Sequence, residues 1–328
     1  MVEFYRTVLT FSVILSLLST VLIGLTINIR RVEAIETIYI RADGSIEGTA
    51  DIFTEDNISY TLIAAINEPI VVERSNIIID GEEHTVSGAR TGTGFTLTNI
   101  SNVTIRNINI EDFTYGICLD ESLNNYISGN NIANNNYGIA FWRWANHNMI
   151  AENNITASVE CGIRLDQSSH NIISENNVTA NNDAGIALHT FSENNTIFGN
   201  IITANNDAGI HLYASSHNNT ISGNNVANNN WGILIWDSDN NTISGNNVTA
   251  NNDGGIHLLG SNNNTVAGNN LTANRGSAIY QDESSLNNTI SGNIGVSIPF
   301  WMGWWLWLVL AIVAGVVLIA GIYFLRKR

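Results

Sequence analysis

The sequence contains few cysteines and few basic residues. Two cysteines and 13 lysines plus arginines occur in 328 residues, against 29 acidic residues, so the formal net charge is -16. Six of the 13 basic residues lie near the two ends of the chain, which leaves the central part more acidic still. Such a surface repels the phosphate backbone of nucleic acids. We therefore expect no nucleic-acid partner.

The sequence has instead a repeat of 22 to 24 residues. An isoleucine recurs at this step along most of the chain, and in seven of eight cases a glycine precedes it. The members of this column are Ile117, Ile139, Ile163, Ile186, Ile210, Ile233, Ile256 and Ile279. A repeat of this length is typical of stacked structures in which each unit buries its apolar face against the next one.

Each unit has room for three short strands and none for a helix. In residues 209–230, for example, three short apolar segments are separated by Asn, Ser and Gly, and apolar residues alternate with polar ones. Alternation with a period of two predicts strands. Three strands and three turns per unit predict an all-β fold, a right-handed single-stranded parallel β-helix. A leucine-rich repeat would need several leucines and a helical return in each unit, and the sequence has neither.

Two more apolar columns and one asparagine column keep the same step. The apolar columns run from Ile127 to Ile290 and from Ile132 to Leu271, and β-branched residues dominate them, as expected where like side chains stack on a pleated surface. The asparagine column has eight members: Asn130, Asn153, Asn176, Asn200, Asn224, Asn246, Asn269 and Asn293. We interpret it as an interior ladder of amides at a sharp turn, with exposed loop asparagines as the alternative.

The two ends of the chain predict export and membrane attachment. Residues 1–34 contain a long apolar run and fit either a cleaved signal peptide or a retained signal anchor. Residues 35–69 are expected to form an atypical strand or cap, and residues 70–297 the β-helix. Residues 298–325 carry no charge and are long enough for a transmembrane helix. The basic tail at 326–328 then places the C-terminus in the cytoplasm and the repeats outside the cell membrane, on a single-pass anchor.

The Gly-Ile-x-Leu strand of each unit carries the candidate binding residues. The residue after Ile and the residue after Leu are expected to point outward, and these positions are rich in aromatic rings, histidines and charged groups. Aromatic rings and a few polar groups are what a glycan groove needs. The expected ligand-binding residues are Trp142, Tyr213, Trp236 and His257. The candidate catalytic residues are Arg164, Asp166, His189 and His211.

Two polar columns beside this strand suggest further sites. Glu160, Asp183 and Asp207 follow one another at the repeat step, which would place them about 4.8 Å apart. Their oxygens suggest Ca²⁺ as the one possible cofactor. The alternatives are that these residues act as catalytic acids or bases, or that they only begin turns. Five Asn-Asn-Thr sequons recur in one turn and are predicted to be exposed to glycosylation, unless composition alone produces them. They begin at Asn194, Asn218, Asn240, Asn263 and Asn287.

The run Asn-Asn-Thr-Ile-Ser-Gly-Asn-Asn-Val at 240–248, followed by Gly-Ile-His-Leu at 255–258, resembles the repeats of NosD-type parallel β-helix proteins. These are also grouped as carbohydrate-binding and sugar-hydrolase repeat domains. The segment 38–45 is similar to the leader of exported archaeal-type members. The resemblance covers about residues 70–294 and implies the β-helix fold, and it leaves copper-site maturation and polysaccharide chemistry open as functions.

Two departures from these chemistries favour a non-catalytic role. Copper maturation implies soft ligands, but the three methionines and two cysteines are not clustered in the sequence. Pectin-cleaving β-helices carry paired aspartates and an Arg-x-Lys set, whereas this chain has no Asp-Asp pair and its only lysine is Lys327. We therefore expect a membrane-anchored extracellular β-helix that binds polysaccharide or has a structural role in the cell envelope. A polysaccharide lyase, hydrolase or epimerase and NosD-like copper handling are the alternatives.

Overall fold

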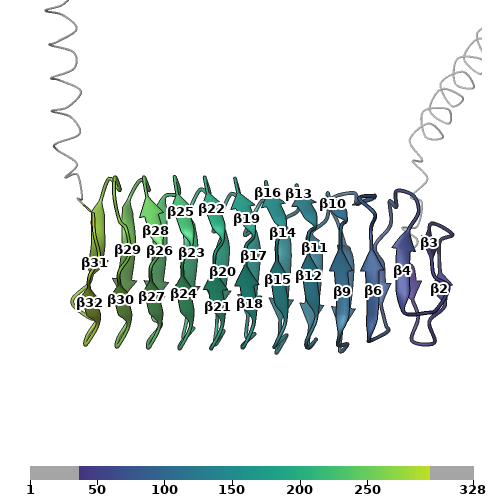
Figure 1. Cartoon of the computed structure of the whole chain (residues 1–328), viewed down its shortest axis with the longest axis horizontal. Helices are drawn as coiled ribbons and strands as arrows, with labels where there is room; N and C mark the ends of the chain where they lie inside the picture. The colour runs from purple at the N-terminus through teal and green to yellow at the C-terminus, as the bar shows by residue number, and fades with distance from the viewer. Residues whose placement is uncertain (1–36, 296–328) are drawn as a thin grey trace, which may run out of the picture. The chain divides into compact units, whose positions relative to one another are not determined.

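The computed structural model describes residues 37–295, and this part of the chain is all β, with short strands and no helix (Figure 1). The chain winds into a right-handed parallel β-solenoid of about ten turns, as the repeat predicts. Each turn, here called a rung, passes through three sheets in the same order, so that strands 22 to 24 residues apart become hydrogen-bonded neighbours. Sheets A and B have 12 strands each and sheet C has eight.

The strands of each sheet neighbour one another in a fixed order. Sheet A contains β2 (Ile46–Glu47), β1 (Ile38–Ile40), β5 (Ile70–Val72), β8 (Thr93–Thr98), β11 (Tyr115–Asp120), β14 (Tyr137–Trp142), β17 (Ile163–Asp166), β20 (Ile186–His189), β23 (Ala208–Tyr213), β26 (Trp231–Trp236), β29 (Gly254–Leu259) and β31 (Ser277–Gln281). Sheet B contains β3 (Ile52–Phe53), β4 (Ser59–Leu62), β6 (Ile77–Asp80), β9 (Val103–Arg106), β12 (Tyr126–Ser128), β15 (Met149–Ala151), β18 (Ile172–Ser174), β21 (Thr196–Phe198), β24 (Thr220–Ser222), β27 (Thr242–Ser244), β30 (Thr265–Ala267) and β32 (Thr289–Ser291). Sheet C contains β28 (Asn247–Thr249), β25 (Asn225–Ala227), β22 (Ile201–Thr203), β19 (Asn177–Thr179), β16 (Asn154–Thr156), β13 (Asn131–Ala133), β10 (Asn109–Glu111) and β7 (Thr85–Ser87).

The three apolar columns meet inside the solenoid and form one continuous core. Ile117, Ile127 and Ile132, which represent the three sheets of one rung, are all fully buried. Each such side chain contributes about 1.5 to 3 kcal/mol when it leaves water. The last described rung is the exception, because Ile290 is 45% exposed there.

The asparagine column is an interior ladder, as predicted. Asn176 Oδ1 accepts hydrogen bonds from the backbone N–H and the side-chain Nδ2 of Asn153, both at 3.0 Å. Its own Nδ2 donates to the carbonyl oxygens of Ile150 and Ser174 and to Asn200 Oδ1. The left-handed backbone of the turn belongs to the preceding residue, Glu175 (φ 56°) in this rung, and not to the ladder asparagine.

The other two corners of the rung hold ladders that the sequence analysis did not identify. One contains Asn125, Asn148, Asn171, Asn195, Asn219, Asn241 and Asn264. The other contains Asn135, Asn181, Asn205, Asn229, Asn251 and Asn274. Each of the three corner positions of a rung thus has a ladder of buried amides that form hydrogen bonds with the backbone of the previous rung. These bonds satisfy polar groups that the turn would otherwise leave unpaired.

Parallel pairing begins at Ile38, earlier than the expected start near Ile70. Strand β1 pairs in parallel with β5, while β2 and β3 fold back antiparallel onto β1 and β4. The residues expected to form a cap therefore supply both the first rung and two short strands that cover its edge. Edge strands that are covered in this way are less open to pairing with a second chain.

Several predictions about the chain ends lie outside the described residues. The signal peptide or anchor at 1–34, the transmembrane helix at 298–325 and the tail at 326–328 belong to this group. Between residues 37 and 295, no helix is long and apolar enough to cross a membrane.

Candidate functional site

The outer face of sheet A is built by three outward columns, one more than the sequence analysis predicted. A methyl group on Gly138 would lie 2.5 Å from the Gly162 carbonyl oxygen and 2.6 Å from Ile155 Cγ2, so the Gly138 α-carbon faces the interior. Ile139 also points inward. Two inward residues in succession interrupt the alternation, and the residue before the glycine consequently returns to the outside.

This third column was missed because a strict period of two places it in the core. It contains Tyr115, Tyr137, Cys161, Ala184, Ala208, Trp231, Gly254 and Ser277. Tyr137 packs with Cys161, Ala184 and Ala187 in a small cluster separate from the main core. The signal that could have found it is the aromatic residue that repeatedly precedes the glycine, at Tyr115, Tyr137 and Trp231.

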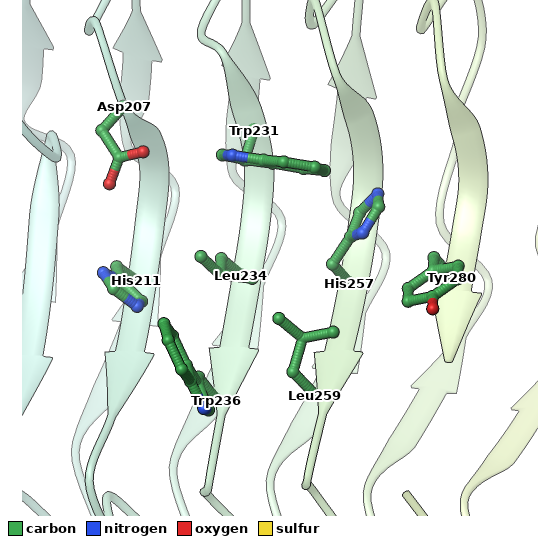
Figure 2. Close-up of a pocket in the computed structure, with 8 residues that line it drawn as sticks. All are labelled: Asp207, His211, Trp231, Leu234, Trp236, His257, Leu259 and Tyr280. Atoms are coloured by element: carbon green, nitrogen blue, oxygen red, sulfur yellow. The ribbon is translucent and has the colours of Figure 1, made fainter. Parts of the chain in front are cut away.

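A pocket of about 520 Å³ lies on this face across four adjacent strands, β23, β26, β29 and β31 (Figure 2). It is lined by Asp207, His211, Trp231, Leu234, Trp236, His257, Leu259 and Tyr280. Four predicted site residues are therefore brought together here, namely Asp207, His211, Trp236 and His257. Most of the remaining lining is aromatic or aliphatic, so the pocket is mainly an apolar surface with a few polar groups.

The aromatic rings of the pocket contact one another from rung to rung. The His257 ring lies between Trp231, with centroids 4.3 Å apart, and Tyr280, at 5.3 Å, as Figure 2 shows. Tyr213 contacts Trp236 edge to face at 5.3 Å. Contacts of this kind fix ring orientations, and the rings therefore form a firm platform.

Two pocket histidines each have a buried ring nitrogen without a hydrogen-bond partner, His211 Nε2 and His257 Nε2. Burial lowers the pKa of His257 to about 4 and also lowers that of His211. Both rings are consequently neutral at pH 7. Both nitrogens are enclosed by protein atoms, and that of His257 lies against the Gly254 backbone.

The four candidate catalytic residues lie on the consecutive strands β17, β20 and β23, and His211, on the last of these, also lines the pocket. Arg164 and Asp166 form an ion pair of 3.1 Å on β17, and the Arg164 guanidinium stands 5.2 Å from the Trp142 ring centroid. Asp166 is in register with His189 on β20, whose ring lies 5.7 Å from that of His211. The pKa of His189 is lowered to about 4, mainly by burial and secondly by the positive charge of Arg164.

Two predicted ligand-binding residues lie outside the lining of the pocket. Trp142 is on β14 and packs against Tyr115 and Arg164. Tyr213 is on β23 and contacts two residues of the lining, Trp236 and His211. The aromatic surface is therefore continuous beyond the pocket, because Arg164, His189 and His211 join its two parts.

The acidic column does not form a compact metal site. Asp207 lines the pocket, and Asp183 Oδ2 accepts a contact from Cys161 Sγ at 3.3 Å. Among residues 37–295, no group of three or more His, Cys, Asp or Glu side chains could hold a metal ion. The expected Ca²⁺ trio of Glu160, Asp183 and Asp207 is therefore not gathered into a three-ligand site among these residues.

The five sequon asparagines all lie on the surface. Asn194, Asn218, Asn240, Asn263 and Asn287 are exposed, and each has a left-handed backbone with φ between 55° and 58°. They recur rung by rung at the turn between sheets A and B. Their accessibility is what glycosylation would require.

The solved structures that this chain resembles share its fold. A variant of the periplasmic alginate epimerase AlgG matches at 20% identity and a TM-score of 0.58, with 75% of this chain and 65% of that chain covered. The Azotobacter vinelandii mannuronan C-5 epimerase AlgE4 A-module matches at 13% identity and 0.52, covering 74% and 87%. DFA-IIIase from Arthrobacter chlorophenolicus A6 matches at 16% and 0.52, covering 70% and 64%. The chain thus spans less than two thirds of two of these proteins, and no curated protein matches it in sequence.

The sequence of the repeats identifies the protein family. The model of the family described as periplasmic copper-binding protein (NosD) matches residues 70–238 and 216–295, which is more than half of the chain. This chain belongs to the NosD family. The resemblance read from the sequence is confirmed for the family, and the NosD repeats are the rungs that carry the sheet A face.

The residues described in this NosD family member do not fit a copper site. Burial raises the pKa of Cys118 to about 12 and also raises that of Cys161, so both thiols stay protonated and are poor metal ligands. No other soft-ligand cluster joins them, since residues 37–295 contain no three-ligand group of His, Cys, Asp or Glu. We derive no step through copper.

Proposed function

We propose that the outer face of sheet A binds a polysaccharide chain that lies across the rungs. The observation that carries this proposal is the pocket spanning β23 to β31, which is lined by Trp231, Trp236 and Tyr280 together with the His211 and His257 rings and the Asp207 carboxylate. Sugar rings present C–H faces that pack on aromatic rings and hydroxyls that bond polar groups. Strands are about 4.8 Å apart, so four of them offer a track about 15 Å long.

Aromatic truncation tests the proposal directly. Trp231→Ala and Trp236→Ala should each weaken binding of the full-length protein to a bound glycan by about 10-fold or more, because interface tryptophans are frequent binding hot spots. Trp144→Asn is the matched control, since Trp144 is 64% exposed and has a left-handed backbone that asparagine tolerates. Binding would be measured by affinity electrophoresis in polysaccharide gels. Equal retardation of all variants would remove this face from consideration.

Catalysis on the same face is a second candidate function, favoured by one observation. Arg164, Asp166 and His189 form a contiguous polar group beside the pocket, and the fold is similar to those of proteins titled as epimerases. A His189 imidazole with a pKa of about 4 is a weak base at neutral pH, which favours binding over proton abstraction. Incubation of the protein with neutral and acidic polysaccharides, followed by NMR of the sugar protons, would reveal epimerised or cleaved product. An Asp166→Asn variant must abolish any turnover that this group supports.

The proposal places the solenoid outside the cytoplasm, with a terminal membrane segment as its anchor. The family description as periplasmic and the apolar segments 1–34 and 298–325 support this arrangement. Protease treatment of intact cells followed by detection of an epitope at each end would test it. Protection of an internal epitope placed in the turn at Asn240 would contradict it.

A further inference from the structure

The charge of the pocket restricts the kind of polysaccharide, and the restriction rests on the proposed function. Of the eight lining residues, Asp207 is the only one that is charged at neutral pH. The nearest guanidinium on the same face, that of Arg164, is already paired with Asp166 at 3.1 Å. Arg275 lies in the turn before β31, is exposed and does not line the pocket. The lining of the pocket therefore contains no cation.

The acidic column strengthens this restriction. Asp183, Asp207 and Asp253 follow one edge of the same face, so a chain lying across the rungs runs beside a row of carboxylates. A sugar carboxylate placed there would lose its hydration and meet like charges, and nothing in the pocket would compensate. The column is interrupted at Asn230 and ends at Asp253, so the penalty applies to sugar carboxylates placed beside Asp183, Asp207 or Asp253.

Neutral sugars match the same groups. The Asp207 carboxylate accepts hydrogen bonds from hydroxyls, and charge-assisted bonds of this kind are the stronger ones. The imidazole rings of His211 and His257 also line the pocket and carry no charge that would repel a neutral sugar or attract a sugar carboxylate. Trp231, Trp236 and Tyr280 supply the apolar surface for the ring faces.

From this combination of a lone carboxylate, two uncharged imidazole rings and an aromatic platform, we infer that the ligand is a neutral polysaccharide and not a polyuronate. The inference separates this chain from what its structural neighbours are titled to act on, because two of those are alginate or mannuronan epimerases.

The test compares two glycan classes on one protein. Full-length protein in detergent would be run in affinity gels containing neutral probes (mannan, mixed-linkage β-glucan, chito-oligosaccharides) or acidic probes (alginate, pectate, hyaluronate). We expect retardation by at least one neutral probe and by no acidic probe. Retardation by an acidic probe alone would overturn the inference and leave the proposed function standing, whereas no retardation by any probe would overturn the proposed function itself.

One substitution gives opposite results for the two classes. Asp207→Asn should weaken binding of the neutral probe by about 10-fold, because a charge-assisted hydrogen bond is lost. If an acidic glycan were the true ligand, the same variant would bind alginate more tightly, since a repelling charge is removed. Asp253→Asn, at an exposed position outside the lining, is the matched control and should leave binding of the neutral probe unchanged. Stronger binding of the neutral probe by Asp207→Asn would also overturn the inference.

Discussion

At the scale of single residues, the ladder asparagines make each turn dependent on the rungs before and after it. The Asn176 side chain makes five hydrogen-bond contacts and is fully enclosed: Oδ1 accepts two, and the two hydrogens of Nδ2 are shared among three acceptors. Only asparagine and glutamine have both a carbonyl oxygen and an NH₂ group, and the glutamine side chain is one methylene longer. The sequons arise at a turn of a second ladder. At Asn194 and at Asn218 the left-handed turn residue is Asn, the ladder residue that follows is Asn, and the first residue of the next strand is Thr.

Replacement of a ladder asparagine should be costly. We predict that Asn176→Ala lowers the free energy of unfolding by about 2 to 4 kcal/mol, because buried donors and acceptors on Asn153, Ile150 and Asn200 lose their partners. Asn177→Ala is the matched control at the next position, where the side chain is exposed, and its effect should stay below about 1 kcal/mol. Urea unfolding followed by circular dichroism measures both values. Equal midpoints for the two variants would contradict the ladder's role.

The buried histidine of the pocket predicts a pH dependence. The pKa of His257 falls from 6.5 to about 4 on folding, because burial outweighs the opposing effect of Asp253. Between these two pH values the unfolded chain binds the proton more tightly, so stability is lost as the pH falls from 6.5 to 4. His257→Phe removes this dependence and should gain about 1 to 3 kcal/mol relative to the unsubstituted protein between pH 7 and pH 4. Urea midpoints at pH 7, 5.5 and 4 measure the difference, and parallel curves for the two proteins would show that the imidazole has no such effect.

At the scale of the strand, the Gly-Ile step decides which side chains reach the outer face. Two successive inward residues rotate the start of each long sheet A strand, and the aromatic residue before the glycine moves outward as a result. The glycine is needed because its neighbours leave no space for a side chain. A methyl group on Gly209 would lie 2.3 Å from Val226 Cγ1 and 2.8 Å from the Gly232 carbonyl oxygen.

Gly209→Ala should therefore strain both the core and the pocket. We predict a loss of about 2 to 4 kcal/mol in the free energy of unfolding, in the range of overpacked cores, together with weaker glycan binding, because Trp231 begins the adjacent strand. Gly223→Asn is the control, since nothing lies within 4 Å of that glycine's added carbon and its φ of 63° suits asparagine. Thermal unfolding and affinity electrophoresis together check the prediction. A Gly209→Ala variant as stable as the control would show that the strand can shift at no cost.

At the scale of the whole described molecule, the solenoid has two ends that parallel pairing alone would leave open. Strands β2 and β3 cover the N-terminal one by pairing antiparallel with β1 and β4. The ion pair of Arg41 with Glu47, at 2.6 Å, links this cap to the first rung, and a second pair joins Arg41 to Glu73 at 3.0 Å. An uncovered end would present a row of unpaired backbone groups to other chains.

Removal of this cap should change the association state. A variant lacking residues 44–54 loses β2 and β3 but keeps β1 and β4, and we predict that it forms dimers or larger species through its exposed edge. Light scattering after size-exclusion chromatography measures the mass, and a retained β spectrum in circular dichroism shows that the rungs still fold. A variant with an intact β spectrum and the same association state as the unshortened protein would contradict the role assigned to the cap.

The sequence by itself determined the repeat, the three inward columns, the Asn130 to Asn293 ladder and the family. Each of these follows from a local pattern that every rung must repeat, because like side chains stack on like. Only the tertiary structure decided which outward residues share a pocket. His211, Trp231, His257 and Tyr280 come from four different rungs, and their grouping depends on the register of parallel strands and on the Gly-Ile step, where the simple alternation fails.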